Sequence, residues 1–567
     1  MPSTEPIHLC AGAVALGVIS HLGIFIRGEW HMQAPALVTV FSLLALVIFF
    51  AEHYYLGADI ASSLKTTSLV ASSYAAGLFT SIAIYRRCFH RLRHFPGPWA
   101  AGVTKFWHVW QCRTGQNHLV MEELRKKYGP IIRTGPEELT IIDPVVPPTV
   151  DGPGSTCTKA VWYDFLLPEI ALNTTRSKPA HDARRRIWDR GFSTKALAVY
   201  QERVVEYAET LATRIEELDR EDKPVNVSDW FYWFTFDVMG EFAFARSFGM
   251  LRDEKWHSAV KLLRKAMSLL GPFSPVPWLA QIAFYITPWM YIVKDWLSMM
   301  QWCKQRMGER INMKVSKPDV SHWLIDASIK KGSLEADREW LNGDAVTIII
   351  AGSDTIAPTL VFAFYELARN PSHQTTLLSE LHGLDIYNPT HLLRCTHLNA
   401  LINETLRLHP PVPTGGYRQS PPSGLTIPIS GDGVFIPGNT TIISPRYSLA
   451  RLESSYQNAD QFIPERWTTH PEMVKDARGF APFSQGRFNC VGKALAMNEM
   501  RFVIALLVTK FEIAFWDNDG DGDKGERLFK DLRDQFTAAP GRLDLRFKKR
   551  TTTTTTTTMT VQSGEPE

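Results

Sequence analysis

The first 85 residues of the chain are dominated by three apolar runs, at 7–26, 34–51 and 68–85. Each run is close to the length that crosses a bilayer core of roughly 30 Å. The first has no Asp, Glu, Lys or Arg, the second is apolar throughout 43–50, and the third is diluted by serine and glycine. We predict a membrane anchor over 1–85 with up to three transmembrane helices. One or two spans are the alternative. A cleaved signal peptide also fits the first run, but no basic residue precedes it.

Four arginines follow the third run directly, and they are Arg86, Arg87, Arg91 and Arg93. The positive-inside rule then places the downstream chain on the cytosolic side, and an odd number of spans places the N-terminus in the lumen. Residues 95–99 read F-P-G-P-W, and two prolines around a glycine do not continue a helix. We therefore predict that 86–99 form a basic, proline-rich hinge.

Residues 100–550 show no linker, repeat or break in composition, which indicates one domain. Helical periodicity dominates it at 195–218, 346–370, 397–408 and 491–511. Runs with strand character are short, at 131–133 and 139–142. The pattern predicts a mainly α fold with small β-sheets. The threonine-rich end, 551–567, is predicted to be disordered.

Charge and cysteine content narrow the possible functions. A net charge of +3 over 567 residues gives no reason to expect a nucleic-acid partner. The seven cysteines are scattered and odd in number, and none forms a C-x-x-C pair. This disfavours a zinc site or a disulfide framework, and it favours reduced thiols in a cytosolic domain.

Cys490 is the one cysteine whose neighbours indicate chemistry, within the segment F-S-Q-G-R-F-N-C-V-G at 483–492. Gly486 favours a turn before the cysteine, and Gly492 opens a long apolar helix. A thiol at a helix N-terminus meets unpaired amide N–H groups and the positive end of the helix dipole, and both favour the thiolate. Such a thiolate is suited to coordinate a haem iron. A buried cysteine beside a glycine-rich turn is the plainer alternative.

Three more motifs precede this segment. Residues 351–355 read A-G-S-D-T, 404–407 read E-T-L-R, and 462–467 read F-I-P-E-R-W. Together with 483–492, and in this order, they resemble the motifs of the cytochrome P450 family. The resemblance runs from residue 96 to about residue 547.

This resemblance implies the cytochrome P450 fold, mainly α with small β-sheets, and a haem b (heme b) cofactor whose iron is held by the Cys490 thiolate. It also implies a monooxygenase that inserts one atom of dioxygen into a lipophilic substrate. A haem-thiolate isomerase or dehydratase is the alternative enzyme, and the intact Asp354 and Thr355 argue against it. A non-catalytic haem-binding membrane protein is a third hypothesis.

The resemblance assigns Asp354 and Thr355 as catalytic residues. They lie in a helix that Gly352 and Pro358 weaken, and Thr355 can bond back to the preceding turn. We expect a kinked or widened groove there, with room for dioxygen and a water. The Thr355 hydroxyl would hold the dioxygen, and Asp354 would help to relay protons from solvent.

The cofactor-binding residues implied by the resemblance are His181, Arg185, Phe483, Gly486, Arg487, Cys490 and Gly492. The two glycines would let backbone approach the flat macrocycle. The family usually has arginine two places before the cysteine, where it contacts a haem propionate, but this chain has Phe488 there. Arg487, one place earlier, is the hypothetical replacement. His181 and Arg185 match the helix that flanks the haem. Glu404, Arg407 and Arg466 are expected to be a buried structural network, because buried charges need partners.

The chain carries no flavin module, so electrons must come from a partner. The resemblance implies NADPH–cytochrome P450 reductase, with cytochrome b5 as a second donor, in the endoplasmic reticulum membrane. The arginines at 184–186, with Lys493 and Arg501, would form a basic docking patch. The aromatic segment 271–300 is expected to be core and lid near the substrate entrance. The motif at 236–240 resembles fungal members of specialised-metabolite pathways.

Overall fold

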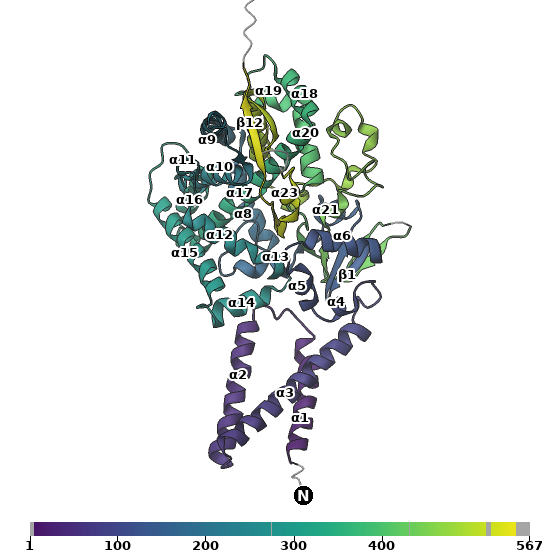
Figure 1. Ribbon diagram of the computed structural model, residues 1–567. Coiled ribbons are helices and arrows are strands. Elements are labelled where there is room, and N and C mark those ends of the chain that lie inside the picture. Colours follow the sequence, from purple (N-terminus) through teal and green to yellow (C-terminus); the bar gives the residue numbers. More distant parts are fainter. Residues whose placement is uncertain (1–4, 274, 430, 518–522, 552–567) are drawn as a thin grey trace, which may run out of the picture.

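The computed structural model describes residues 5–273, 275–429, 431–517 and 523–551. The predicted fold class is confirmed: a mainly helical domain with small sheets stands on a group of N-terminal apolar helices (Figure 1). The predicted disorder of the threonine-rich end concerns residues 552–567 almost entirely, and these lie outside the described residues.

The three N-terminal apolar runs form helices. α1 spans Glu5–Ser20, α2 spans Ala34–Phe50 and α3 spans Ile60–Ile84, each extended by one further helical turn. In the described chain four helices are long and apolar enough to cross a membrane, and the fourth, α17 (Arg338–Arg369), is mostly buried in the domain. The number of membrane spans stays a prediction.

Two glycines let α1 and α3 pack closely. A Cβ atom on Gly17 would lie 2.3 Å from the Tyr74 carbonyl oxygen, and one on Gly77 would lie 2.2 Å from that of Val14. Small residues at a crossing bring helix backbones together where van der Waals packing, rather than exclusion of water, drives association. The two helices cross beneath the domain (Figure 1).

The loop between α1 and α2 is held by ion pairs to the catalytic domain. Both terminal nitrogens of Arg176 donate to the Glu29 carboxylate at 2.8 Å. His31 Nε2 lies 2.8 Å from an Asp164 oxygen, to which Arg176 also donates at 2.7 Å. The α1–α2 loop therefore lies on the same side of the anchor as the domain.

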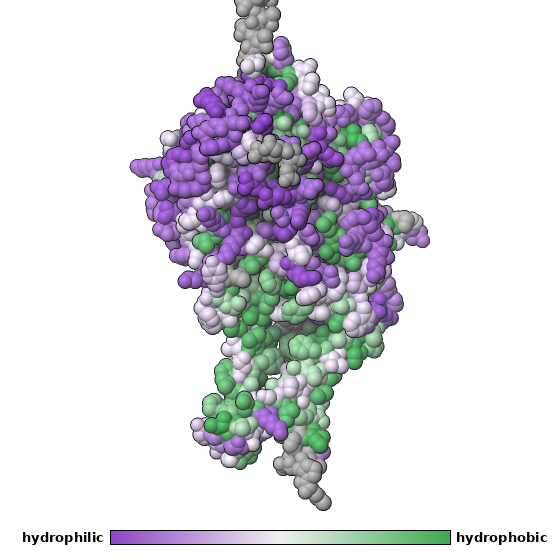
Figure 2. All heavy atoms as spheres, viewed as in Figure 1, coloured by the Kyte–Doolittle hydropathy of each residue, from purple (hydrophilic) through white to green (hydrophobic). Residues whose placement is uncertain are grey.

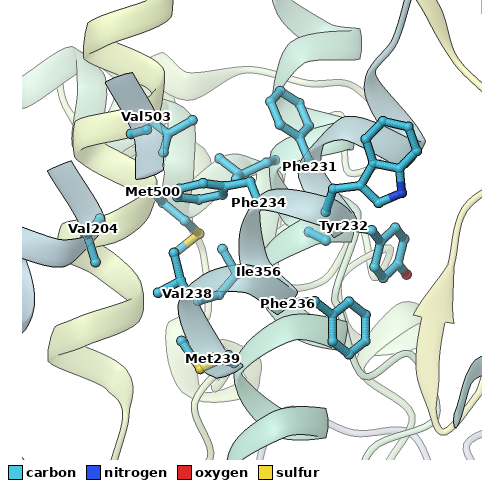
Figure 3. Close-up of a cluster of buried hydrophobic side chains, with 14 of the residues drawn as sticks. Val204, Phe231, Tyr232, Phe234, Phe236, Val238, Met239, Ile356, Met500 and Val503 are labelled. Atoms are coloured by element: carbon cyan, nitrogen blue, oxygen red, sulfur yellow. The ribbon is translucent and has the colours of Figure 1, made fainter. Parts of the chain in front are cut away.

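The centre of the domain is formed by α17 and α10 (Val227–Phe244), with α9 (Thr194–Arg220) and α22 (Lys493–Lys510) packed beside them. Apolar side chains from all four helices meet there (Figure 3). Burial of this surface supplies the main force for folding. The predicted helices match α9, α17, α20 and α22, although α17 begins eight residues before its apolar pattern, in the polar segment R-E-W-L-N-G-D-A.

The remaining longer helices surround this centre. They are α6 (Asn117–Tyr128), α8 (Lys178–Gly191), α12 (Ser258–Ser268), α14 (Pro277–Ile286), α15 (Tyr291–Ile311), α16 (Val320–Lys331), α18 (Pro371–Leu381) and α20 (Thr396–Leu408). Shorter helical segments used below are η4 (Val161–Leu166), α4 (Trp99–Val103), α5 (Phe106–Cys112) and η5 (Pro464–Trp467).

Four small sheets complete the domain. Their strand orders are β1-β2-β8-β5-β3, β4-β12-β9, β6-β7 and β10-β11. The strands are β1 (Ile131–Gly135), β2 (Glu138–Ile141), β3 (Thr158–Lys159), β4 (Val225–Asn226), β5 (Tyr417–Gln419), β6 (Leu425–Ile427), β7 (Val434–Ile436), β8 (Thr441–Ile443), β9 (Phe511–Phe515), β10 (Arg533–Gln535), β11 (Thr537–Ala539) and β12 (Asp544–Lys549). β1 and β2 confirm the two predicted strand runs.

Apolar surface gathers over the anchor helices and the adjoining end of the domain, whereas the far end is hydrophilic (Figure 2). Large aromatic side chains are exposed on α4, α5, α14, the turn after α14 and the start of α15, and they include Trp99, Trp110, Tyr285, Trp289 and Tyr291. Trp and Tyr favour the boundary between lipid and water, because one end of each ring system is apolar and the other polar. This end of the domain is suited to rest on a membrane.

Candidate active site

Cys490 lies in the wall of an internal cavity of about 400 Å³. Its backbone N–H donates to the Phe483 carbonyl oxygen at 2.8 Å, which closes the loop before α22. Burial raises the pKa of the thiol, while the amides of Gly492 and Lys493 and the charge of Arg185 lower it. The N–H donors expected at the helix N-terminus are present. In the protein without haem, however, burial has the larger effect on the pKa of the Cys490 thiol.

Only some of the other residues predicted in the cysteine loop line the cavity. Phe483 and Gly492 line the cavity with Cys490, but Gly486 and Arg487 do not. Gly486 has a φ of +57°, and a Cβ atom there would lie 2.2 Å from the Asp151 carbonyl oxygen. Packing of one chain segment on another therefore requires this glycine, and its expected approach to a cofactor stays a prediction.

Arg487 does not line the cavity, and its guanidinium pairs with the Asp182 carboxylate of α8. Its contact with a haem propionate stays a prediction. His181 and Arg185, on the same helix, do line the cavity. Arg185 donates to the Asn489 carbonyl oxygen at 2.8 Å and so joins α8 to the cysteine loop. Burial, followed by the charge of Lys159, lowers the pKa of His181 to about 4, which makes this imidazole neutral at pH 7.

Phe488 contacts two cationic side chains that the sequence did not identify. Lys159 Nζ lies 4.9 Å and the Arg418 guanidinium carbon 5.2 Å from the centre of its ring. The ring of His181, which the sequence did identify, meets it edge-on, with centroids 4.9 Å apart. Arg446 also lines this cavity. A positive charge therefore reaches this part of the cavity from β3 and β5, although residue 488 carries none.

These cations are incompletely neutralised. Arg418 and Arg446 share the carboxylate of Asp151. Lys159 donates to the Leu172 carbonyl oxygen at 2.8 Å, and within the described chain it has no carboxylate partner. Burial, together with Arg418, lowers the pKa of Lys159 well below its ordinary value. One buried terminal nitrogen of Arg446 has no hydrogen-bond acceptor among the described residues.

The cavity therefore fits a haem. A sulfur donor with amide N–H groups directed at it is suited to bind the iron. The three cations are Lys159, Arg418 and Arg446, and the one carboxylate among them is that of Asp151. The set therefore leaves two positive charges, which equals the negative charge of the two haem propionates. Buried charges are stable only with partners, and the propionates supply them.

Thr355 lines the cavity on α17, and its hydroxyl donates to the Ala351 carbonyl oxygen at 2.7 Å, as predicted. Asp354 does not line the cavity and is 5% exposed. Burial raises the pKa of Asp354 from 3.8 to about 6, against the opposing charge of Arg264. That guanidinium stacks on Tyr232 and Trp256. The acid and the hydroxyl thus occupy different faces of one helix.

α17 continues as one helix through this point, with Pro358 inside it. Pro358 has no N–H, so the Asp354 carbonyl loses its helical donor. The kinked or widened groove expected here stays a prediction. Gly352 has a packing role: a Cβ atom there would lie 2.0 Å from Met239 Sδ of α10. The glycine lets the two central helices approach each other.

Glu404, Arg407 and Arg466 form one buried network outside the cavity. The Glu404 carboxylate accepts hydrogen bonds from Arg407 at 2.8 and 2.9 Å and from Arg466 at 3.0 Å. The Trp467 indole N–H donates to it at 2.9 Å. Burial alone would raise the pKa of Glu404, but the two guanidiniums outweigh it and hold the pKa below its ordinary value. The network ties α20 to η5.

The basic patch expected on the cysteine side is smaller than predicted. Arg184 is buried and donates to Asp344 at 2.6 Å. Arg501 is also buried and donates to Asn399 at 2.7 Å. Arg186 and Lys493 remain exposed. Tertiary contacts therefore remove two of the expected charges from the surface.

Comparisons with known proteins agree with this site. The family model for cytochrome P450 matches residues 96–531. Tryprostatin B 6-hydroxylase of Aspergillus fumigatus is 36% identical over 91% of this chain and 92% of its own length. Cytochrome P450 monooxygenase FCK2 of Fusarium pseudograminearum is 36% identical over 95% and 97%. The crystal structure of a cytochrome P450DA heme domain shares the fold, with a TM-score of 0.62 and 19% identity over 77% of this chain and 94% of that one.

A helical domain with a cavity-facing cysteine loop and a buried Glu–Arg–Arg network defines a haem-thiolate protein. The chain belongs to the cytochrome P450 family, and within it to the fungal monooxygenases of secondary metabolism. The family holds its haem through a cysteine thiolate.

Proposed function

We propose that this protein is a monooxygenase of the endoplasmic reticulum membrane that oxidises a lipophilic metabolite in a fungal biosynthetic pathway, with electrons from NADPH–cytochrome P450 reductase. The observation that carries the proposal is that Cys490 and Thr355 line one cavity. Bound through a thiolate, haem supplies the activation and cleavage of dioxygen. An isomerase or dehydratase would need neither the hydroxyl nor the acid beside it.

We assign a separate role to each group of side chains around the cavity. Cys490 would bind the iron, while Lys159, Arg418, Arg446, His181 and Arg185 would hold the propionates. The Thr355 hydroxyl donates its one hydrogen to the Ala351 carbonyl oxygen, so its oxygen is available to accept hydrogen bonds in the cavity. Asp354 has a pKa of about 6 and so exchanges protons near neutral pH. We assign it to proton delivery from the α10 side of α17.

The anchor supports a location at the membrane with a cytosolic domain. The α1–α2 loop contacts the domain, so both lie on one side of the bilayer. Three spans then place the N-terminus and the α2–α3 loop in the lumen. The basic hinge after α3 favours the cytosol for the domain. Arg186 and Lys493 would contribute to docking of the reductase, and cytochrome b5 is a second donor of the same charge type.

A lipophilic substrate is supported by the composition of the cavity wall. Aromatic side chains from five parts of the chain line it, namely Trp162, Phe165, Trp188, Phe242, Trp296 and Phe536. The relatives named after tryprostatin B hydroxylation support a substrate from fungal secondary metabolism. Metabolite profiling of a strain that lacks this gene would show which precursor accumulates.

The decisive experiment is the carbon monoxide difference spectrum of the reduced protein. The wild-type protein and the control Cys303→Ala, which removes a buried thiol of α15, should both show the haem-thiolate band. Cys490→Ala should abolish it. Turnover that requires NADPH, dioxygen and the reductase would then distinguish a monooxygenase from an isomerase. A thiolate band in Cys490→Ala, or none in the wild-type protein, would overturn the proposal.

A further inference from the structure

One polar pair in the wall of the cavity joins a turn to α17. Asn173 and Thr347 both line it, and the one hydroxyl hydrogen of Thr347 is shared between Asn173 Oδ1 at 2.8 Å and the Gly343 carbonyl oxygen at 3.0 Å. Asn173 belongs to the turn between η4 and α8, and Thr347 belongs to α17. No other hydrogen bond is made by the Asn173 side chain within the described chain, so its two N–H donors are free.

The turn that carries Asn173 is fixed to α17 by buried contacts. Asp344, one helical turn before Thr347, accepts a hydrogen bond from the Leu172 backbone N–H at 3.0 Å. The same carboxylate accepts from Arg184 at 2.6 Å and from the Trp188 indole at 3.0 Å. Its side chain is fully buried. Charge-assisted bonds of this kind hold a loop more firmly than neutral ones.

Backbone packing adds to this fixation. A Cβ atom on Gly343 would lie 2.5 Å from the Ile170 carbonyl oxygen, so the turn lies directly on the helix. Asn173 is nevertheless more than one-third exposed. Because the residue lines the cavity, its free amide is accessible from inside it. The chain therefore presents a donor at low entropic cost, since backbone and side chain are already ordered.

We propose that the Asn173 amide, oriented by Thr347, binds a carbonyl oxygen of the substrate and so determines how the substrate lies in the cavity. This inference deepens the proposed function and rests on it. The substrate class is a flat, largely aromatic molecule with a ketone or amide carbonyl at one end. Thr347 and Thr355 are eight residues apart on one helix, about 12 Å along its axis. A molecule of two or three rings spans that separation.

The test uses the full-length haem-loaded protein and two probes of nearly equal shape, 2-acetylnaphthalene and 2-ethylnaphthalene. They differ by a carbonyl oxygen in place of two hydrogens. Dissociation constants come from the change in the haem absorption spectrum on titration. The ratio of the ketone constant to the hydrocarbon constant removes the general effect of hydrophobicity when proteins are compared.

Asn173→Asp replaces both N–H donors by an acceptor and should shift this ratio about tenfold against the ketone. Thr347→Val should shift it in the same direction, because the amide loses its orienting partner, whereas Thr347→Ser should retain the wild-type ratio. An unchanged ratio in Asn173→Asp overturns the inference. A thiolate band in the carbon monoxide spectrum of every variant, with turnover of the wild-type protein that requires NADPH, dioxygen and the reductase, shows that the proposed function stands independently of that result.

Discussion

Lys159 and Phe488 are in contact, with the ammonium nitrogen 4.9 Å from the centre of the ring. Phe488 occupies the position at which the family usually has arginine. A positive charge is still present beside that position, but it comes from Lys159 of β3, more than 300 residues earlier in the chain. The departure in the sequence is therefore a relocation of charge.

Lys159→Met should weaken retention of the haem, because a propionate loses its nearest ammonium. We expect the haem to transfer to apomyoglobin about ten times faster than from the wild-type protein. The apoprotein should become more stable to heat, since a buried cation without a carboxylate partner has been removed.

The exposed control Lys195→Met should change neither property, and Phe488→Arg in the Lys159→Met background should slow the transfer again. Equal transfer rates from wild type and Lys159→Met would show that Lys159 does not serve the cofactor.

Asp354→Asn should change stability in a pH-dependent way. Burial raises the pKa of Asp354 to about 6, so ionisation destabilises the folded protein as the pH rises from about 4 to about 6. Asparagine lacks this penalty. The variant should therefore gain about 3 kcal/mol relative to wild type between about pH 4 and about pH 8.

Thermal unfolding of both proteins at the two pH values measures this gain in stability. Turnover by Asp354→Asn should fall about a hundredfold, because proton delivery is lost. Parallel stability profiles for the two proteins would refute the raised pKa.

Glu404→Gln should destabilise the domain by about 3–5 kcal/mol, because two buried guanidiniums lose their shared carboxylate. Denaturant unfolding of the holoprotein, followed by the haem spectrum, measures the change. The matched control is Glu335→Gln, which breaks an exposed pair with Arg338 and should cost less than about 1 kcal/mol. Equal effects of the two substitutions would contradict a structural role for the network.

The contact of Glu29 and His31 with the domain predicts the membrane topology. In sealed microsomes, a cysteine introduced by Glu29→Cys should react with a membrane-impermeant thiol reagent from outside, as the cytosolic domain does. A cysteine introduced by Ala58→Cys should react only after the membrane is permeabilised. Labelling is measured above the background of the parent protein. Reaction of both positions from outside would exclude three spans.

The sequence by itself determined the features whose information is local. Each of these features depends on neighbouring residues, so side-chain periodicity and turn-forming residues predict it. They are the anchor runs, the hinge, the central helices and the cysteine loop. Glu404 and Arg407 are one helical turn apart, so their pairing was also predictable. Only Arg466 had to come from a distant segment, and the order of the motifs indicated it.

Tertiary structure decided which side chains share the cavity. Arg418 and Phe488 meet across 70 residues of sequence, Lys159 reaches them from 259 residues before Arg418, and Asn173 meets Thr347 across 174 residues. Arg487 and Arg501 found polar partners elsewhere, because a charged side chain binds whichever partner the packed chain brings within reach. Gly352 and Gly486 are likewise required by close contacts with backbone and side chains from other segments, and the spacing of the sequence does not show these contacts. Long-range packing, which local pattern does not encode, assigns these contacts.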